Sequence, residues 1–319
     1  MTKEDAIQKI VDYLLRNTDK MTSQGLFNGK AGLSISLFMA YGYLQDEQLE
    51  DKAYDLFQES LIAQTPDLSF ESGLAGVGYA LLYLIENKYV DADFDEIFAE
   101  QYERIIKINI EKDPLRLLNS MQLIYFLTKV SGIKKEEKRI GEMMQKIFEG
   151  LELFLAIQFC DFTDIQYIND KVAVLNIYKT YLKLIDYAGY PNFSRLVLED
   201  YAALYRKGMI VSTVETGYYL NRLTEKYHIK GYEDVINDNK KFGIKNIFPS
   251  TLSLRERIDL AKLVNNEEID LFSEFEHIKN DKIIKDLLNK VDEKTHPLGY
   301  GAGLGRFLIY CVDKNIELL

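Results

Sequence analysis

The sequence contains no tryptophan, only two cysteines and only five prolines among its 319 residues. Two cysteines cannot build a disulfide framework, which favours a reducing compartment. No Pro-, Ser- or Gly-rich linker interrupts the chain, so we expect a single domain over residues 1–319. No uninterrupted apolar run reaches about 18 residues, so no membrane span is predicted. The charged, amphipathic first residues do not resemble a signal peptide.

Positive charge is also scarce, because 39 Lys and Arg stand against 50 Asp and Glu, for a net charge of −11 at pH 7. This balance argues against a nucleic-acid backbone or an anionic membrane surface as partner. It fits a free cytoplasmic protein or one that meets basic partners. We therefore expect a peptide or protein partner, with no nucleic acid and no membrane.

The alternation of apolar and polar residues that is typical of strands is nearly missing. Apolar residues instead recur at three-and-four spacing, as in 6–15, 140–151 and 283–291, which predicts amphipathic helices. Between these lie segments richer in apolar and small residues, such as "AGLSISLFMAYGYL" and "AGVGYALLYLI". A helix that is apolar on most sides is buried on most sides. The sequence therefore predicts an all-α protein in which amphipathic and buried helices alternate.

Three buried segments open with the same dipeptide, at Ala31-Gly32, Ala75-Gly76 and Ala302-Gly303. The first two are 44 residues apart and the third lies 227 residues further on, about five such periods. A constant period of this size indicates an array of helical hairpins. With four further buried-type segments between them, seven buried helices are predicted to begin near residues 31, 75, 118, 171, 214, 253 and 302.

The last of these segments carries glycine at 299, 301, 303 and 305, which raises the alternative of a dinucleotide-binding loop. Such a loop follows a strand and leads through a helix to another strand. Neither neighbour of this segment has the pattern of a strand. Because glycine has no Cβ, we interpret the glycines as positions where the ends of buried helices approach closely.

Gly-x-Ala-Gly opens a buried helix at Gly29–Gly32 and at Gly73–Gly76, with a variant at Tyr300–Gly303. This pattern resembles the lanthionine synthetase C-like proteins. The resemblance implies an (α/α)7 toroid, in which seven inner helices are ringed by seven outer helices. The alternation of helix types extends this resemblance over nearly the whole chain. Specific motifs match in three of the seven blocks, where a block is one predicted buried helix with the residues that lead into it.

The cyclases of that family hold zinc with a Cys in the fifth block and a Cys-His pair in the sixth block. A His in the fourth block is usually assigned the role of general acid or base. Zinc lowers the pKa of a substrate thiol, so that the thiolate closes a thioether ring. Here "VETGYYLNRL" and "TLSLRERIDLAKL" contain neither Cys nor His, and "YINDKVAVLNI" contains no His. We therefore expect no zinc, no other cofactor and no cyclase activity. Cys160 and Cys311 are expected to be small buried hydrophobes.

In a toroid, the residues just before the inner helices surround one mouth of the central cavity. These residues are Asn28, Glu71, Asn119, Asp170, Glu215, Ser253 and His296. The predicted ligand-binding residues are Asn28, Glu71, Asp170, Glu215, His296 and Tyr300. Helix capping is the alternative for each acidic residue, and a loop or capping role is the alternative for His296. If the carboxylates share one pocket, replacing Glu71 and Asp170 by Gln or Asn should abolish ligand binding and leave the fold intact.

Three functions stay open at this point. The first is a lanthionine synthetase C-like protein without zinc that binds a peptide or partner protein in the central cavity, as an accessory in modified-peptide, lantibiotic-type biosynthesis. The second is a glycosidase-like hydrolase that uses Glu71 with Asp170 or Glu215 as acid and base. The missing tryptophan weighs against it, because sugars commonly stack on indole rings. The third is a scaffold whose outer helices bind another protein.

Overall fold

The computed structural model describes residues 3–109, 117–118, 120–247, 252–265, 297–301 and 303–313. These residues contain thirteen α-helices and no strand, which confirms the all-α prediction. The chain divides into two compact units: unit 1 is Met1–Lys107 with Pro249–Leu319, and unit 2 is Ile108–Phe248. No helix in the described part of the chain is long and apolar enough to cross a membrane.

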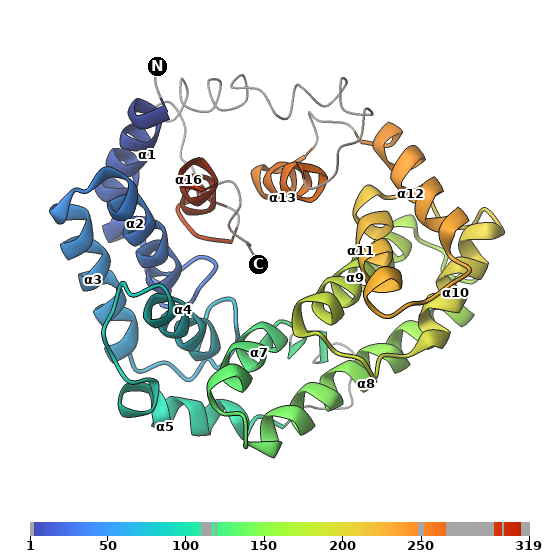
Figure 1. Ribbon diagram of the computed structural model, residues 1–319, viewed down its shortest axis with the longest axis horizontal. Coiled ribbons are helices and arrows are strands. Elements are labelled where there is room, and N and C mark those ends of the chain that lie inside the picture. Colours follow the sequence, from blue (N-terminus) through green and yellow to red (C-terminus); the bar gives the residue numbers. More distant parts are fainter. Residues whose placement is uncertain are drawn as a thin grey trace. The chain divides into compact units, whose positions relative to one another are not determined.

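Unit 1 contains α1 (Lys3–Asn17), α2 (Lys30–Leu44), α3 (Glu47–Ile62), α4 (Leu74–Glu86), α5 (Phe94–Ile106), α13 (Leu254–Asn265) and α16 (Leu304–Val312). Helices α16, α2 and α4 pack in one layer with α13 beside α16, and α1, α3 and α5 cover this layer (Figure 1). The last helix therefore contacts α1 and α2, the first two of the chain. A toroid requires this contact, and the toroid as a whole stays a prediction.

Unit 2 contains α7 (Leu123–Ile133), α8 (Lys138–Cys160), α9 (Ile168–Ala188), α10 (Arg195–Arg206), α11 (Val214–Lys226) and α12 (Glu233–Lys245). Helix α9 packs between α7 and α11, and α8, α10 and α12 form a second layer on them. Both units thus have the two-layer packing of helical hairpins that the alternating helix types predict.

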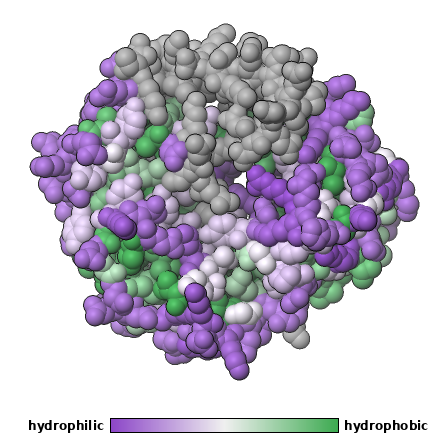
Figure 2. Space-filling view, in the orientation of Figure 1, coloured by the Kyte–Doolittle hydropathy of each residue, from purple (hydrophilic) through white to green (hydrophobic). Residues whose placement is uncertain are grey.

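The two helix types differ in burial as expected. Helix α2 is buried at every residue from Ala31 to Ala40, whereas α3 and α5 bury only one side. Helices α3 and α5 begin at polar caps: Asp46 accepts a hydrogen bond from the Gln48 amide, and Asp93 accepts from the amides of the first turn of α5, as carboxylates at N-caps commonly do. On the face drawn in Figure 2, the described helices present mainly hydrophilic residues, with small hydrophobic patches between them.

The predicted starts of the buried helices agree closely with the structure at 30, 74, 214, 254 and 304. Helix α9 begins at Ile168, earlier than the predicted 171. Near the predicted 118, residues 117, 118 and 120 are helical, and a turn at 121–122 separates them from α7, which begins at Leu123. The expectation for Cys160 is wrong, since this residue is exposed at the end of α8 while its neighbour Phe159 faces the core. Cys311 is buried, as expected.

Buried polar side chains hold the layers of unit 2 together. Asn239, which has no exposed surface, accepts hydrogen bonds through Oδ1 from the Tyr201 hydroxyl at 3.1 Å and from the Thr213 amide at 3.0 Å. It thereby joins α12 to α10 and to the start of α11. Because buried polar groups without partners are costly, this one amide side chain fixes three segments.

A second polar contact in unit 2 is made by Glu152 of α8. Its Oε1 accepts hydrogen bonds from the Tyr181 hydroxyl and from the Ser194 amide, both at 2.8 Å. Burial raises the pKa of Glu152 above its usual value, and the two hydrogen bonds offset only part of this effect. The folded protein therefore takes up a proton at this carboxyl more readily than the unfolded chain does.

Candidate functional site

Three loops of unit 1 have the same construction and lead into α2, α4 and α16. Each ends in a glycine that caps the helix in extended conformation, Gly29, Gly73 or Gly303. In each loop the first helical amide donates to a carbonyl seven residues earlier: Lys30 to Ser23 at 3.0 Å, Leu74 to Asp67 at 3.0 Å, and Leu304 to Pro297 at 2.8 Å. We call the loops 23–29 and 67–73, with residues 297–301 and 303 of the third loop, the glycine end of unit 1.

This shared hydrogen bond corrects the alignment of the third block. The sequence places Ala302-Gly303 with Ala31-Gly32, whereas the structure places Gly303 with the cap glycines Gly29 and Gly73, three residues away from that alignment. Glycines at every second position fit several registers, so the sequence alone could not choose between them. In the corrected register Arg306 takes the position of Gly32. Ala302 itself lies outside the described residues.

The loops of the glycine end are bonded to one another through their backbones. The Phe27 amide donates to the Glu71 carbonyl at 2.9 Å, and the Phe27 carbonyl accepts from the Gly301 amide at 2.7 Å. A Cβ at Gly25 would overlap the backbone of Ser72, so the loops can come this close only because glycine lacks that atom. The interpretation of the glycines as close-approach positions is confirmed here.

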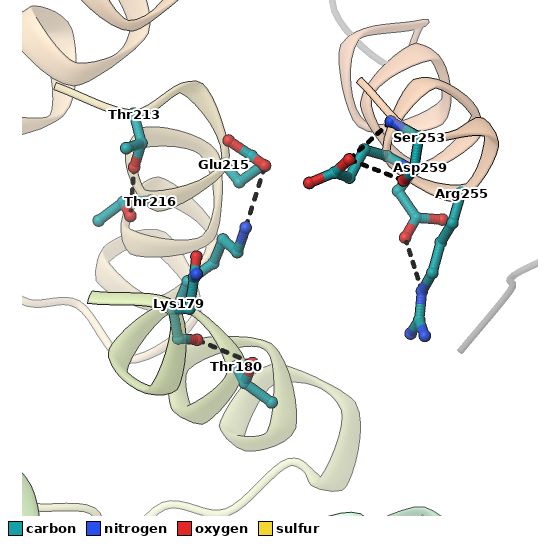
Figure 3. Close-up of polar contacts among 10 residues, drawn as sticks. Lys179, Thr180, Thr213, Glu215, Thr216, Ser253, Arg255 and Asp259 are labelled. Carbon is teal, nitrogen blue, oxygen red and sulfur yellow. Dashed lines mark hydrogen bonds and ion pairs between the residues drawn. The ribbon is translucent and has the colours of Figure 1, made fainter. Parts of the chain in front are cut away.

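Helix α13 begins beside the glycine end. Ser253 and Glu256 form a capping box, in which the Glu256 amide donates to Ser253 Oγ at 3.2 Å and the Ser253 amide donates to Glu256 Oε2 at 2.8 Å (Figure 3). The Arg255 guanidinium lies 5.0 Å from the centre of the Phe27 ring. The start of α13 and the loop before α2 are thus in direct contact.

An ion-pair cluster joins α13 to α16. Asp259 pairs with two arginines. Arg255 Nε lies 3.6 Å from Asp259 Oδ2 (Figure 3), and Arg306 Nη2 donates a hydrogen bond to Asp259 Oδ1. Arg306 is fully buried, whereas the side chains of Arg255 and Asp259 are 33% exposed. These three residues were not among the predicted site residues, although Arg306 is the one charged residue within the apolar segment 304–312.

The structure brings some of the predicted site residues together within unit 1. Asn28 and Glu71 are exposed on adjacent loops of the glycine end. Neither one caps a helix, because the caps are Gly29 and Gly73. Tyr300 lies on the third loop and is buried, with its Cβ packed against Gly32. Asn119 and His296 lie outside the described residues.

Two predicted site residues, Asp170 and Glu215, belong to unit 2. Asp170 is exposed in the first turn of α9. Glu215, in the first turn of α11, pairs with Lys179 of α9 at 3.2 Å (Figure 3). Lys179 lies nine residues beyond Asp170, about 13 Å along the helix. That Asp170 and Glu215 share one pocket stays a prediction.

The residues that the structure describes do not fit the zinc ion of the cyclases. Among the described residues, no group of three or more His, Cys, Asp or Glu side chains is placed to hold a metal. In the fifth block, Glu215 in the first turn of α11 is paired with Lys179. In the sixth block, α13 contains Arg255 and Asp259 and has neither Cys nor His. Zinc prefers thiolate and imidazole ligands, and the guanidinium groups that pair with Asp259 repel a cation.

A comparison with protein-family models matches residues 2–138 to the family described as Lanthionine synthetase C-like protein. The match includes the Gly-x-Ala-Gly blocks at 29–32 and 73–76. Searches of curated proteins and of solved structures found no match. The family that residues 2–138 match is thus the one that the sequence resembles, the lanthionine synthetase C-like proteins.

Proposed function

We propose that this protein is a lanthionine synthetase C-like peptide-binding protein without thioether cyclase activity, and that it acts as an accessory in modified-peptide biosynthesis in the cytoplasm. The ligand binds at the glycine end of unit 1. The observation that carries the proposal is that the loops with exposed Asn28 and Glu71 are bonded to each other, and that Arg255 of α13 lies over the ring of Phe27, the neighbour of Asn28.

These side chains suit a peptide because they offer both donors and acceptors. Asn28 supplies an amide donor and a carbonyl acceptor, Glu71 supplies carboxylate acceptors, and Arg255 supplies guanidinium donors. A peptide backbone alternates N–H and C=O groups, so it needs both kinds of partner along its length. The loops that carry these residues are held by backbone hydrogen bonds and by close glycine contacts, and a rigid support lowers the entropic cost of binding.

Selection from a library of random dodecamer peptides on the immobilised full chain tests the proposal. Wild type should enrich a defined peptide family, and Asn28→Ala with Glu71→Gln should weaken binding of a selected peptide by about tenfold or more. Glu199→Gln, on the exposed side of α10, is the matched control and should bind as wild type. Equal binding by the double variant, with an unchanged circular dichroism spectrum, would contradict the proposed site.

The same selected peptide tests whether the predicted site extends to unit 2. Asp170→Asn weakens binding if Asp170 opens onto the same cavity as Glu71, which is the toroid prediction. Unchanged binding by Asp170→Asn would confine the site to unit 1.

The lack of cyclase chemistry has its own test. After dialysis against a weak chelator, metal analysis should find no stoichiometric zinc, because the fifth and sixth blocks supply neither Cys nor His. One zinc ion per chain would contradict this part of the proposal.

A further inference from the structure

Arg306 occupies an unusual position in α16. In the register fixed by the loop hydrogen bonds, α2 has Gly32 and α4 has Gly76 at the equivalent place. Arg306 has no exposed surface and is one of the largest fully buried side chains of the protein. Arginine stays charged at any physiological pH, so a full positive charge lies inside unit 1.

This buried charge is only partly compensated. Nη2 of Arg306 donates to Asp259, whereas Nε and Nη1 have no hydrogen-bond partner in the part of the chain that the structure describes. Buried N–H groups in native proteins nearly always have an acceptor, and leaving a charged donor without one is expensive. The two nitrogens therefore call for an acceptor that comes from outside these residues.

The charge around Arg306 specifies the kind of acceptor. Asp259 is shared between Arg306 and Arg255, so two guanidinium groups face one carboxylate. The other acid of α13, Glu256, accepts hydrogen bonds from Ser253 at 2.7 and 2.8 Å. Among the described side chains, Arg306, Arg255 and Asp259 thus give the seam between α13 and α16 an excess of positive charge, in a chain whose net charge is −11. Such a seam attracts an anion.

We infer that this seam binds a carboxylate group of the peptide ligand, held by Arg306 together with Arg255. The inference rests on the proposed function and names the chemical group that is recognised. Arg255 and Asp259 are each 33% exposed, so a carboxylate arriving from solvent meets Arg255 first and completes the hydrogen bonding of Arg306 deeper in the seam. Charge-assisted hydrogen bonds of this kind are the stronger ones in proteins.

The test uses the full chain labelled with nitrogen-15 in arginine and follows the Nε–H signal of Arg306 by NMR. The signal is assigned by its loss in Arg306→Lys. Acetyl-triglycine offers a terminal carboxylate, acetyl-Gly-Asp-Gly-amide offers a side-chain carboxylate, and acetyl-triglycinamide offers none. The first or the second probe should shift the signal, which tells the two carboxylate sources apart, and the third should not. Arg306→Lys should weaken binding of the active probe about 10- to 100-fold.

Arg206→Lys is the matched control, because Arg206 also pairs with an aspartate but has its Nε and Nη2 donors taken by Asp234 and the Gly231 carbonyl. It should bind the probe as wild type does. If Arg306→Lys fails to fold, Arg306→Met with Asp259→Leu removes both charges and keeps apolar volume, which commonly preserves stability. That double variant should fold and should not bind the probe.

Equal shifts with all three probes, no shift with either carboxylate, or wild-type affinity in Arg306→Lys or in the folded double variant would overturn the inference. If selected peptides bind the chain but do so independently of Arg306, the proposed function stands and the inference fails. If the carboxylate probes bind at Arg306 and the library yields no peptide, the carboxylate site at Arg306 stands and the proposed peptide-binding function fails.

Discussion

The two units tie the starts of their helices to neighbouring segments in different ways. In unit 1 the loops before α2, α4 and α16 bond to one another through backbone groups, at distances that only glycine allows. In unit 2 the start of α11 is held by a side chain, Asn239, and the start of α10 by another, Glu152. A backbone contact does not require the side chains of the loop, whereas a side-chain contact uses them for stability.

The largest effect is expected from a substitution that forces the glycine end apart. Alanine at Gly32 would place its Cβ into the Leu26 carbonyl oxygen and 2.6 Å from the Tyr300 Cβ. Neither neighbour is a flexible side-chain end, so Gly32→Ala should lower the free energy of unfolding by about 3 kcal/mol or more. Urea denaturation measures this change.

Gly132→Ala in α7 of unit 2 is the matched control, because nothing lies within 4 Å of the Cβ it would add. It should be neutral or stabilise by about 0.5–1 kcal/mol, since alanine favours the helix. Equal stability of the two variants would contradict the close backbone contact on which the comparison depends.

A smaller loss of folding stability is expected when the Asn239 side-chain contact of unit 2 is removed. Asn239→Ala leaves the Tyr201 hydroxyl and the Thr213 amide without their acceptor, so it should lower the free energy of unfolding by about 2–4 kcal/mol. Asn221→Ala, which removes only a hydrogen bond to Glu225 on the helix surface, should change it by less than about 0.5 kcal/mol. A neutral Asn239→Ala would show that water replaces the side chain.

The smallest effect concerns the second polar contact of unit 2. Because burial raises the pKa of Glu152, this carboxyl stabilises the fold less as the pH rises from 4.5 through its raised pKa. Glu152→Gln keeps an acceptor for Tyr181 and Ser194 and cannot ionise. Compared with wild type, it should gain stability between pH 4.5 and pH 7 in thermal melts, whereas a relative loss over this range would contradict the sign.

The comparison also explains how much of the structure could be predicted from the sequence. Close backbone contact requires glycine, and glycine at a fixed distance before an apolar run is visible in the sequence, so the starts of α2 and α4 could be placed within a residue. The third block was misaligned because its glycines recur at every second residue. The side-chain contacts of Asn239 and Glu152 leave no such trace, since one polar residue in an amphipathic helix looks like any other.

The candidate site could be predicted only in part, for the same reason. The position before each buried helix identified Asn28 and Glu71, because the fold places those positions at one end of unit 1. Arg255 and Asp259 look like an ordinary surface pair at i and i+4. Arg306 was detectable as a charge inside an apolar run, but its partner on α13 depends on packing between segments that no local pattern encodes.

The central claim is that a ligand binds at the glycine end of unit 1. Amide hydrogen exchange of the full chain, with and without a library-selected peptide, tests it most directly because exchange reports each segment separately. We predict that the peptide slows exchange in residues 23–30, 67–74 and 252–259, around Asn28, Glu71 and Arg255. Slowed exchange confined to unit 2, with these three segments unchanged, would contradict the claim.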